Sequence, residues 1–153
     1  MQNILFVCTG NSCRSVMAEG IFSKMAAVNP GAFIYGSAGV SAIDGYPPTS
    51  QTIQAMKEEE GIDVSAHRSR RLTGSMIREA DKIFVMEAVH RDAILRFFPE
   101  AKNKVFLLKE FCGEPGAGPE DLDIPDPIRM SDFFYKNVLY VIRDCLRKLI
   151  ERL

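Results

Sequence analysis

One short segment near the N-terminus combines a cysteine, a glycine-containing turn and an arginine: Cys8-Thr9-Gly10-Asn11-Ser12-Cys13-Arg14-Ser15. Gly10 and Asn11 tolerate backbone conformations that turn successive main-chain N–H groups inward, which forms a nest for an anion. A helix that begins near Ser15 would add its positive end, and Arg14 can hold two oxygens of a phosphoryl group. Both would favour the thiolate form of Cys8, which is the nucleophilic form. The segment therefore predicts a phosphate-sized anion site with a nucleophile at its start.

The position of this segment in the fold matters, because a cysteine and an arginine six residues apart are by themselves a common coincidence. Short apolar runs typical of strands covered on both faces occur at residues 4–7, 33–35, 83–86 and 105–108. Open parallel sheets bind their ligands beyond the carboxyl ends of the strands. Because Cys8 directly follows the first run, the segment lies where such a sheet would place a site.

Apolar residues at helical spacing separate these runs. The helical stripes span residues 17–28, 53–56, 89–97 and 134–149. Residues 29–31 end the first stripe, Gly61 is expected at a positive φ after the second, and Ser131 with Asp132 offers an N-cap to the last. The Gly-, Pro- and acid-rich segment 113–127 is interpreted as a surface loop. The alternation predicts an open α/β sandwich with right-handed crossovers, and residues 1–153 are expected to form a single domain.

Composition limits the kinds of partner. Lys and Arg number 19 and Asp and Glu number 20, so the balance of charge favours neither nucleic acid nor an anionic membrane as a partner. The apolar run at the N-terminus is too short for a membrane span or a signal sequence. We therefore expect a cytoplasmic protein, a monomer, with its four cysteines reduced. Two distant histidines, and cysteines without short paired spacing, predict no metal site, and no cofactor is expected.

Further motifs follow the first segment in a specific order. They are Met17-Ala18-Glu19, Ser37-Ala38-Gly39, Gly61-Ile62-Asp63, His67-Arg68-Ser69-Arg70 and Asp123-Ile124-Pro125-Asp126-Pro127. With the C-x5-R-S pattern at residues 8–15, the chain resembles the low-molecular-weight protein tyrosine phosphatases over nearly its whole length, including their protein-arginine-phosphatase branch. The resemblance implies a three-layer α/β sandwich with a central four-stranded parallel sheet. It also implies metal-independent hydrolysis of phosphorylated protein side chains.

The resemblance assigns roles to individual residues. Cys8 would be the nucleophile that forms a phosphocysteine, and residues 9–15 would bind the phosphate, with Ser15 donating a hydrogen bond to the Cys8 sulfur. Asp126 would protonate the leaving group and then deprotonate the attacking water. Without the resemblance, Asp123 and Asp126 are more typical of solvated turns, so the resemblance alone favours Asp126 over Asp123.

A buried polar network around the loop is also implied, with these members: Asn11, Ser15, Ser37 and His67. It would hold the backbone of Asn11 in an unusual state and orient Ser15. Taken alone, His67 is more typical of a surface histidine or of a core histidine with satisfied hydrogen bonds. His90 belongs to no motif and is interpreted as structural.

The remaining cysteines have open interpretations. Cys13 could form a reversible disulfide with Cys8 that protects Cys8 from overoxidation, or it could be a small packed thiol. Cys112 is interpreted as a loop residue, and Cys145 as a core residue of the last helix.

Two features bear on the substrate. The tyrosine-directed branch usually carries aromatic residues after the catalytic Asp-Pro, where this chain has Ile128 and Arg129. That branch also carries bulky aliphatic residues at the positions of Thr9 and Ser12, where the arginine branch carries threonines. A hydroxyl can accept a hydrogen bond from phosphoarginine, whereas an aliphatic wall suits a phenyl ring. We interpret the chain as a phosphotyrosine phosphatase, with phosphoarginine as the alternative substrate.

Two further function classes share parts of this pattern. Thiol-linked arsenate reductases share this fold and loop but need closely spaced relay cysteines, and none occurs between Cys13 and Cys112. A module that only binds phosphate would lack either the nucleophile or the acid, whereas Cys8 and Asp126 are both present. The sequence therefore favours the phosphatase.

Overall fold

The computed structural model describes residues 1–112 and 121–153 and contains a four-stranded parallel sheet. The strands are β1 (Gln2–Cys8), β2 (Phe33–Gly39), β3 (Lys82–Val85) and β4 (Val105–Leu107). Each predicted apolar run forms a strand, which confirms the α/β fold. The strand order is β2-β1-β3-β4. Because β1 lies inside the sheet, its last residue, Cys8, reaches the carboxyl edge between two neighbouring strands.

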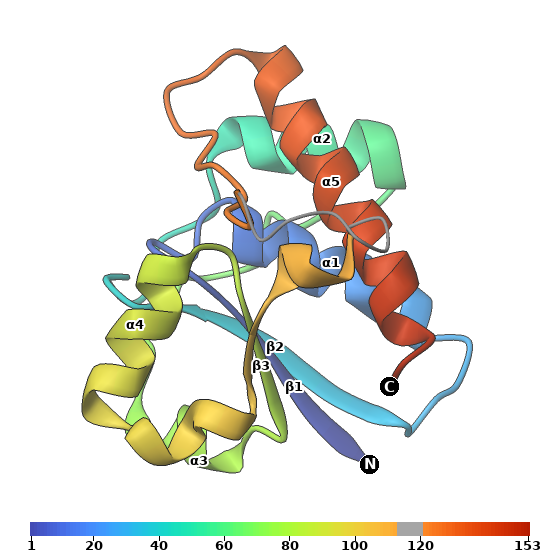
Figure 1. Ribbon diagram of the computed structural model, residues 1–153. Coiled ribbons are helices and arrows are strands. Elements are labelled where there is room, and N and C mark those ends of the chain that lie inside the picture. Colours follow the sequence, from blue (N-terminus) through green and yellow to red (C-terminus); the bar gives the residue numbers. More distant parts are fainter. Residues whose placement is uncertain (113–120) are drawn as a thin grey trace.

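Helices cover both faces of this sheet, which gives the expected three layers (Figure 1). The α-helices are α1 (Arg14–Ala26), α2 (Ser50–Glu60), α3 (Gly74–Glu79), α4 (Ala88–Phe97) and α5 (Asp132–Ile150). Two short 3-10 helices, η1 (Pro99–Asn103) and η2 (Leu108–Phe111), flank β4. The apolar pattern did not predict α3, because six residues are too few to show a helical period.

Alternate residues of β1 belong to two separate cores. Ile4 and Phe6 pack into a cluster with α1 and α5 on one face of the sheet, whereas Leu5 and Val7 pack with α3 and α4 on the other face. The Phe6 ring has no exposed surface, and truncating a buried phenylalanine to alanine costs about 3–5 kcal/mol. Burial on both faces makes β1 a rigid support for the residues that follow it.

The predicted helix ends agree in part with the structure. Gly61 is the C-cap of α2 with a φ of 68°, and the Ser131 side chain accepts a hydrogen bond from the Phe134 N–H at the start of α5. Both predictions are confirmed. The first predicted helical stripe, residues 17–28, is too long at its C-terminal end, because α1 ends at Ala26 and Val28 is 88 % exposed.

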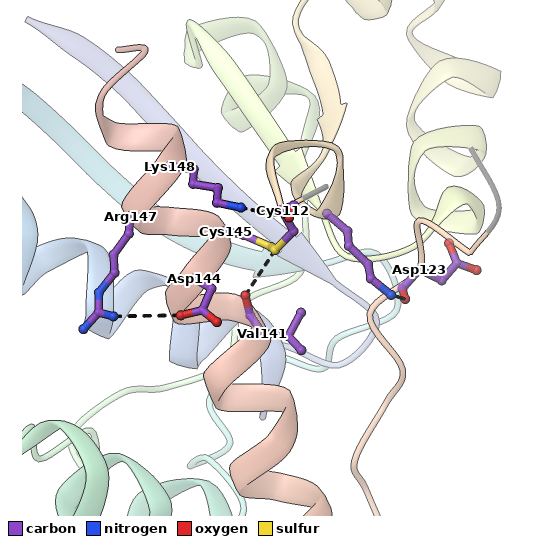
Figure 2. Close-up of a disulfide and its surroundings, with 8 residues drawn as sticks. Cys112, Asp123, Val141, Asp144, Cys145, Arg147 and Lys148 are labelled. Carbon is purple, nitrogen blue, oxygen red and sulfur yellow. Dashed lines mark hydrogen bonds and ion pairs between the residues drawn. A yellow bond between two sulfur atoms is a disulfide. The ribbon is translucent and has the colours of Figure 1, made fainter. Parts of the chain in front are cut away.

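Cys112 and Cys145 form a disulfide, so the expectation of four reduced cysteines is wrong for this pair (Figure 2). Cys112 follows η2, which packs against α5, and Cys145 lies on the buried face of α5, with the two Cα atoms 4.5 Å apart. The expectation rested on chain size and compartment, which indicate whether a disulfide is needed but not which cysteines lie together.

The segment before α5 crosses the carboxyl edge of the sheet. Residues 113–120 of the predicted surface loop lie outside the described residues. Residues 122–127 belong to no helix or strand, and the Ile124 N–H donates to the carbonyl oxygen of Met86, just after β3. Among the described helices, none combines the length and apolar character that crossing a membrane would require.

Candidate active site

The loop between β1 and α1 presents main-chain N–H groups that have no protein partner. Within residues 1–112 and 121–153, the N–H groups from Thr9 to Arg14 donate no hydrogen bond to another protein group. Four carbonyl oxygens of this region accept main-chain hydrogen bonds. Those of Cys8, Thr9, Ser12 and Cys13 accept from the N–H groups of Val40, Ser41, Thr49 and Met17, respectively. Unpaired N–H groups beside a helix N-terminus form a nest for an anion.

The close approach of β2 to this loop requires a glycine. A Cβ atom at Gly39 would lie 2.5 Å from the Thr9 carbonyl oxygen and 2.8 Å from the Asn11 nitrogen. Asn11 itself has a φ of 52°, in the left-handed region that asparagine tolerates better than most residues. The shape of the loop therefore determines the residue types at positions 39 and 11.

The Asn11 side chain holds that conformation through hydrogen bonds in several directions. Its Oδ1 accepts from the Arg70 main-chain N–H over 3.0 Å, which identifies the amide orientation. Its Nδ2 therefore donates to Ser15 Oγ at 2.8 Å and to Ser37 Oγ at 2.9 Å. His67 Nε2 also lies 3.2 Å from Oδ1 and must be the donor. The structure thus brings together Asn11, Ser15, Ser37 and His67.

Glu19 completes this group on the side away from the loop. Ser37 donates to Glu19 Oε1 over 3.0 Å, and His67 Nδ1 lies 3.8 Å from Glu19 Oε2. Burial raises the pKa of Glu19, but the hydrogen bonds with His67 and Ser37 outweigh it and hold that pKa below its usual value. Glu19 is therefore a carboxylate that accepts from Ser37 and lies beside the ring of His67.

Cys8 lies at the start of the nest and is only 3 % exposed. Its Sγ atom is 2.9 Å from Ser15 Oγ. Because Ser15 Oγ already accepts from Asn11 Nδ2, its hydroxyl proton is available to the sulfur. A thiolate in this position would receive a hydrogen bond from Ser15.

Arg14 is the largest fully buried side chain of the site, at 1 % exposure. Nη1 donates to Glu87 Oε2 at 2.6 Å and to the Ile124 carbonyl oxygen at 2.7 Å. Nη2 is 3.5 Å from Thr9 Oγ1 and 3.7 Å from Asp126 Oδ2. One edge of the guanidinium is therefore anchored, and the other faces the loop and Asp126.

The structure separates the two candidate acids. Asp126 is 42 % exposed and pairs with Arg14, whereas Asp123 Oδ1 accepts from the Ala88 N–H at the start of α4. The Ile128 N–H donates to Asp126 Oδ1 and holds the turn around it. We call residues 121–131, which carry both aspartates, the acid segment. Within it, Asp126 adjoins the arginine of the anion site, and Asp123 caps a helix.

Cys13 packs away from the nest. Its Sγ is 3.6 Å from Thr49 Oγ1 and 3.7 Å from the Tyr135 hydroxyl. Burial raises the pKa of Tyr135 to about 12, so its hydroxyl stays protonated beside the sulfur. Cys13 is a free thiol in this structure, and the disulfide between Cys8 and Cys13 stays a prediction.

Three residues that sequence reasoning did not assign to the site contact it: Glu19, Glu87 and His90. Glu87 binds Arg14, and His90 Nε2 lies 2.8 Å from Thr9 Oγ1. A signal existed for Glu87, because it comes two residues after β3 and so lies at the same sheet edge as Cys8. Among the described residues, no cluster of His, Cys, Asp or Glu is suited to hold a metal ion.

Comparison with known proteins agrees with this geometry. Residues 3–153 match the family model described as low molecular weight phosphotyrosine protein phosphatase. A protein-arginine-phosphatase from Geobacillus stearothermophilus is 39% identical over 150 residues, which cover 98% of this chain and 92% of that protein. A probable low molecular weight protein-tyrosine-phosphatase from Ralstonia solanacearum is 35% identical over 143 residues, which cover 94% of this chain and 90% of that protein.

A solved structure shows the same fold over the full length. The crystal structure of a low molecular weight protein tyrosine phosphatase from T. tengcongensis superposes with a TM-score of 0.89 at 37% identity, and covers 100% of both chains. The loop from Cys8 to Ser15, the parallel sheet that carries it and these matches agree with one another. The chain belongs to the low molecular weight phosphotyrosine protein phosphatase family.

Proposed function

We propose that this protein hydrolyses phosphorylated protein side chains, with phosphotyrosine as its main substrate, through a phosphocysteine at Cys8. The observation that carries the proposal is the nest of unpaired N–H groups from Thr9 to Arg14, which begins at Cys8 and adjoins the Nη2 edge of Arg14. An anion of phosphate size would receive main-chain hydrogen bonds and a guanidinium there. The same groups would hold the charge that develops on the phosphoryl oxygens.

In the first step, the Cys8 thiolate attacks phosphorus and the bond from phosphorus to the leaving-group atom breaks. That atom takes the bond electrons and a proton from Asp126, which becomes a carboxylate. Asp126 suits this role because it is half-exposed, near the phosphoryl site and next to Arg14. Asp123 does not, because its carboxylate caps α4.

In the second step, the Asp126 carboxylate takes a proton from water, and the water oxygen attacks phosphorus. The bond between phosphorus and sulfur breaks, and its electrons return to Cys8. The Ser15 hydroxyl, held by Asn11 Nδ2, stabilises the departing sulfur. The cycle releases inorganic phosphate and restores the acid form of Asp126.

Exposed apolar side chains on the segments around the loop support phosphotyrosine. Tyr46 is 60 % exposed, on the segment whose Thr49 N–H bonds the Ser12 carbonyl. Ile128 is 46 % exposed, two residues after Asp126. These side chains can cover the faces of a phenyl ring.

Phosphoarginine is the second candidate substrate, and two observations favour it. Ser12 Oγ has only a long contact, 3.7 Å, with Cys13 Sγ among the described side chains, so its lone pairs can accept from a substrate N–H. The Geobacillus stearothermophilus relative is named a protein-arginine-phosphatase.

The test is a comparison of kcat/KM on matched peptides that differ only in carrying phosphotyrosine or phosphoarginine. We expect the larger value for phosphotyrosine, with activity retained in the presence of a chelator. A larger value for phosphoarginine would transfer the assignment to the second candidate. Equal values would overturn both assignments. We also propose that the protein is cytoplasmic, monomeric and independent of metal ions. Measuring the molecular mass of the purified protein in solution tests whether it is a monomer, and the assay with a chelator tests the independence of metal ions.

A further inference from the structure

His90 lies in the first turn of α4 and is buried, with 1 % of its surface exposed. Its Nδ1 accepts a hydrogen bond from the Glu87 main-chain N–H over 3.0 Å. Burial and the charge of Arg14 lower the pKa of His90 to about 4, so the ring is neutral at pH 7 and carries one proton. Since Nδ1 is an acceptor, that proton lies on Nε2.

The acceptor for this proton is the Thr9 hydroxyl, 2.8 Å from Nε2. Arg14 Nη2 donates to the same oxygen over 3.5 Å. A hydroxyl oxygen has two lone pairs and one proton. With both lone pairs directed at donors, the Thr9 O–H must donate elsewhere, and it has no acceptor among the described residues. Thr9 is exposed and directly follows the nucleophile.

A similar arrangement occurs at Ser15, the other hydroxyl near Cys8. Asn11 Nδ2 donates to Ser15 Oγ, which directs the Ser15 proton to the Cys8 sulfur. In both cases a buried side chain donates to the oxygen of a hydroxyl, so the hydroxyl proton can be donated to a reacting group. The Ser15 hydroxyl donates to the Cys8 sulfur, and the Thr9 hydroxyl is free to donate to the bound anion.

We propose that His90 is a positioning residue that orients the Thr9 hydroxyl as a donor to a phosphoryl oxygen of the bound substrate. The proposal rests on the proposed function in one respect, namely that the anion in the nest is a phosphoryl group. Thr9 thereby adds a side-chain donor to the main-chain N–H groups of the loop. His90 transfers no proton, because its role is to occupy a lone pair of Thr9.

A pair of matched variants separates this role from that of His90 within α4. The amide of asparagine reaches the position of imidazole Nδ1, and the amide of glutamine reaches that of Nε2. His90→Asn can therefore keep the contact with the Glu87 N–H but loses Thr9, whereas His90→Gln can still donate to Thr9. Thr9→Val removes the hydroxyl itself.

The measurement is the affinity of each full-length variant for inorganic phosphate at pH 7, by titration calorimetry. We expect Thr9→Val and His90→Asn each to weaken binding about 10-fold and His90→Gln to bind nearly as well as the original protein. The double variant Thr9→Val/His90→Asn should bind no more weakly than Thr9→Val alone, because the two residues act through one hydrogen bond.

Two results would overturn the proposal. One is equal affinity of His90→Asn and His90→Gln for phosphate. The other is a double variant whose loss is the product of the single losses, about 100-fold, which would mean that His90 acts independently of Thr9. Phosphate binding does not depend on which phosphorylated residue is hydrolysed. Failure of the proposed substrate would therefore leave this result standing, and failure here would leave the peptide assay unchanged.

Discussion

The phosphate loop and the acid segment meet at Arg14, but the structure holds them in different ways. The loop is fixed by buried side-chain hydrogen bonds from distant parts of the chain, among them Asn11 to Ser37 and to the Arg70 N–H. The acid segment is attached mainly at its start, where Asp123 and Ile124 bond the residues after β3, and Asp126 beyond them is 42 % exposed. The loop proposed to bind the anion is therefore preorganised, whereas the segment proposed to donate the proton is attached more lightly.

This difference has a chemical reason. Stabilising charge on phosphoryl oxygens requires donors that do not reorganise during the reaction. Proton transfer to a large leaving group requires an acid that the substrate can approach and that water can reach in the second step. A loop fixed by side-chain hydrogen bonds and an exposed carboxylate meet these two requirements.

The largest effect is expected at the nucleophile. Cys8→Ser should lower kcat by at least about 10⁴-fold while inorganic phosphate still binds, because the nest is main chain and stays intact. Steady-state hydrolysis and phosphate titration check the two parts. Cys13→Ser is the matched control and should keep most of the activity, since Cys13 contacts Thr49 and Tyr135 instead of the nest. Full hydrolysis by Cys8→Ser would disprove the covalent mechanism.

Asp126→Asn comes next and tests the acid segment. It should slow hydrolysis by about 10²–10⁴-fold for aryl phosphates with poor leaving groups and much less for good ones, because only poor leaving groups need the proton. The measurement is kcat/KM across a series of leaving-group pKa values. Asp123→Ala should show no such dependence and should instead lower stability by about 1 kcal/mol, as expected for a lost helix cap. A dependence on the leaving group in Asp123→Ala alone would reverse the two assignments.

The disulfide provides a test of how the acid segment is held. The bond between Cys112 and Cys145 closes a loop with a sequence separation of 33 that contains the whole acid segment. Its reduction should lower the free energy of unfolding by about 3–4 kcal/mol on the chain-entropy model. Urea denaturation of Cys8→Ser with and without dithiothreitol measures this without interference from the active-site thiol. Cys112→Ala should not respond to dithiothreitol, and an equal response would show that the disulfide is not the cause.

The smallest effect concerns pH. The pKa of His90 is lowered from 6.5 to about 4 in the folded protein, so between these values the unfolded chain binds a proton that the folded chain does not. Stability is therefore lost as the pH falls below 6.5, by about 2 kcal/mol at pH 5. Urea denaturation at pH 7 and pH 5 should show this extra loss in the original protein and not in His90→Gln. An equal loss of stability in both proteins would show that a group other than His90 causes it.

The phosphate loop could be predicted far better than its surroundings. An apolar run, a cysteine at its end, Gly10 and a helix start are neighbours in sequence, and local backbone geometry is enough to predict a turn with inward N–H groups. The helix caps at Gly61 and Ser131 were predictable for the same reason. Asp126 could not be told from Asp123 in this way, because the two differ only in what they contact.

Residue types and local spacing by themselves determined the alternation of strands and helices, and they predicted the loop proposed to bind the anion and the nucleophile proposed at its start. The tertiary structure decided which distant groups come together. Glu87 binds Arg14, His90 lies within hydrogen-bond distance of Thr9, and Cys145 forms the disulfide with Cys112. The physical reason is that spacing along the chain fixes a contact only within a few residues. The contacts of Glu87 and His90 with the loop exist because β3 pairs beside β1 in the sheet, and that of Cys145 because η2 packs on α5.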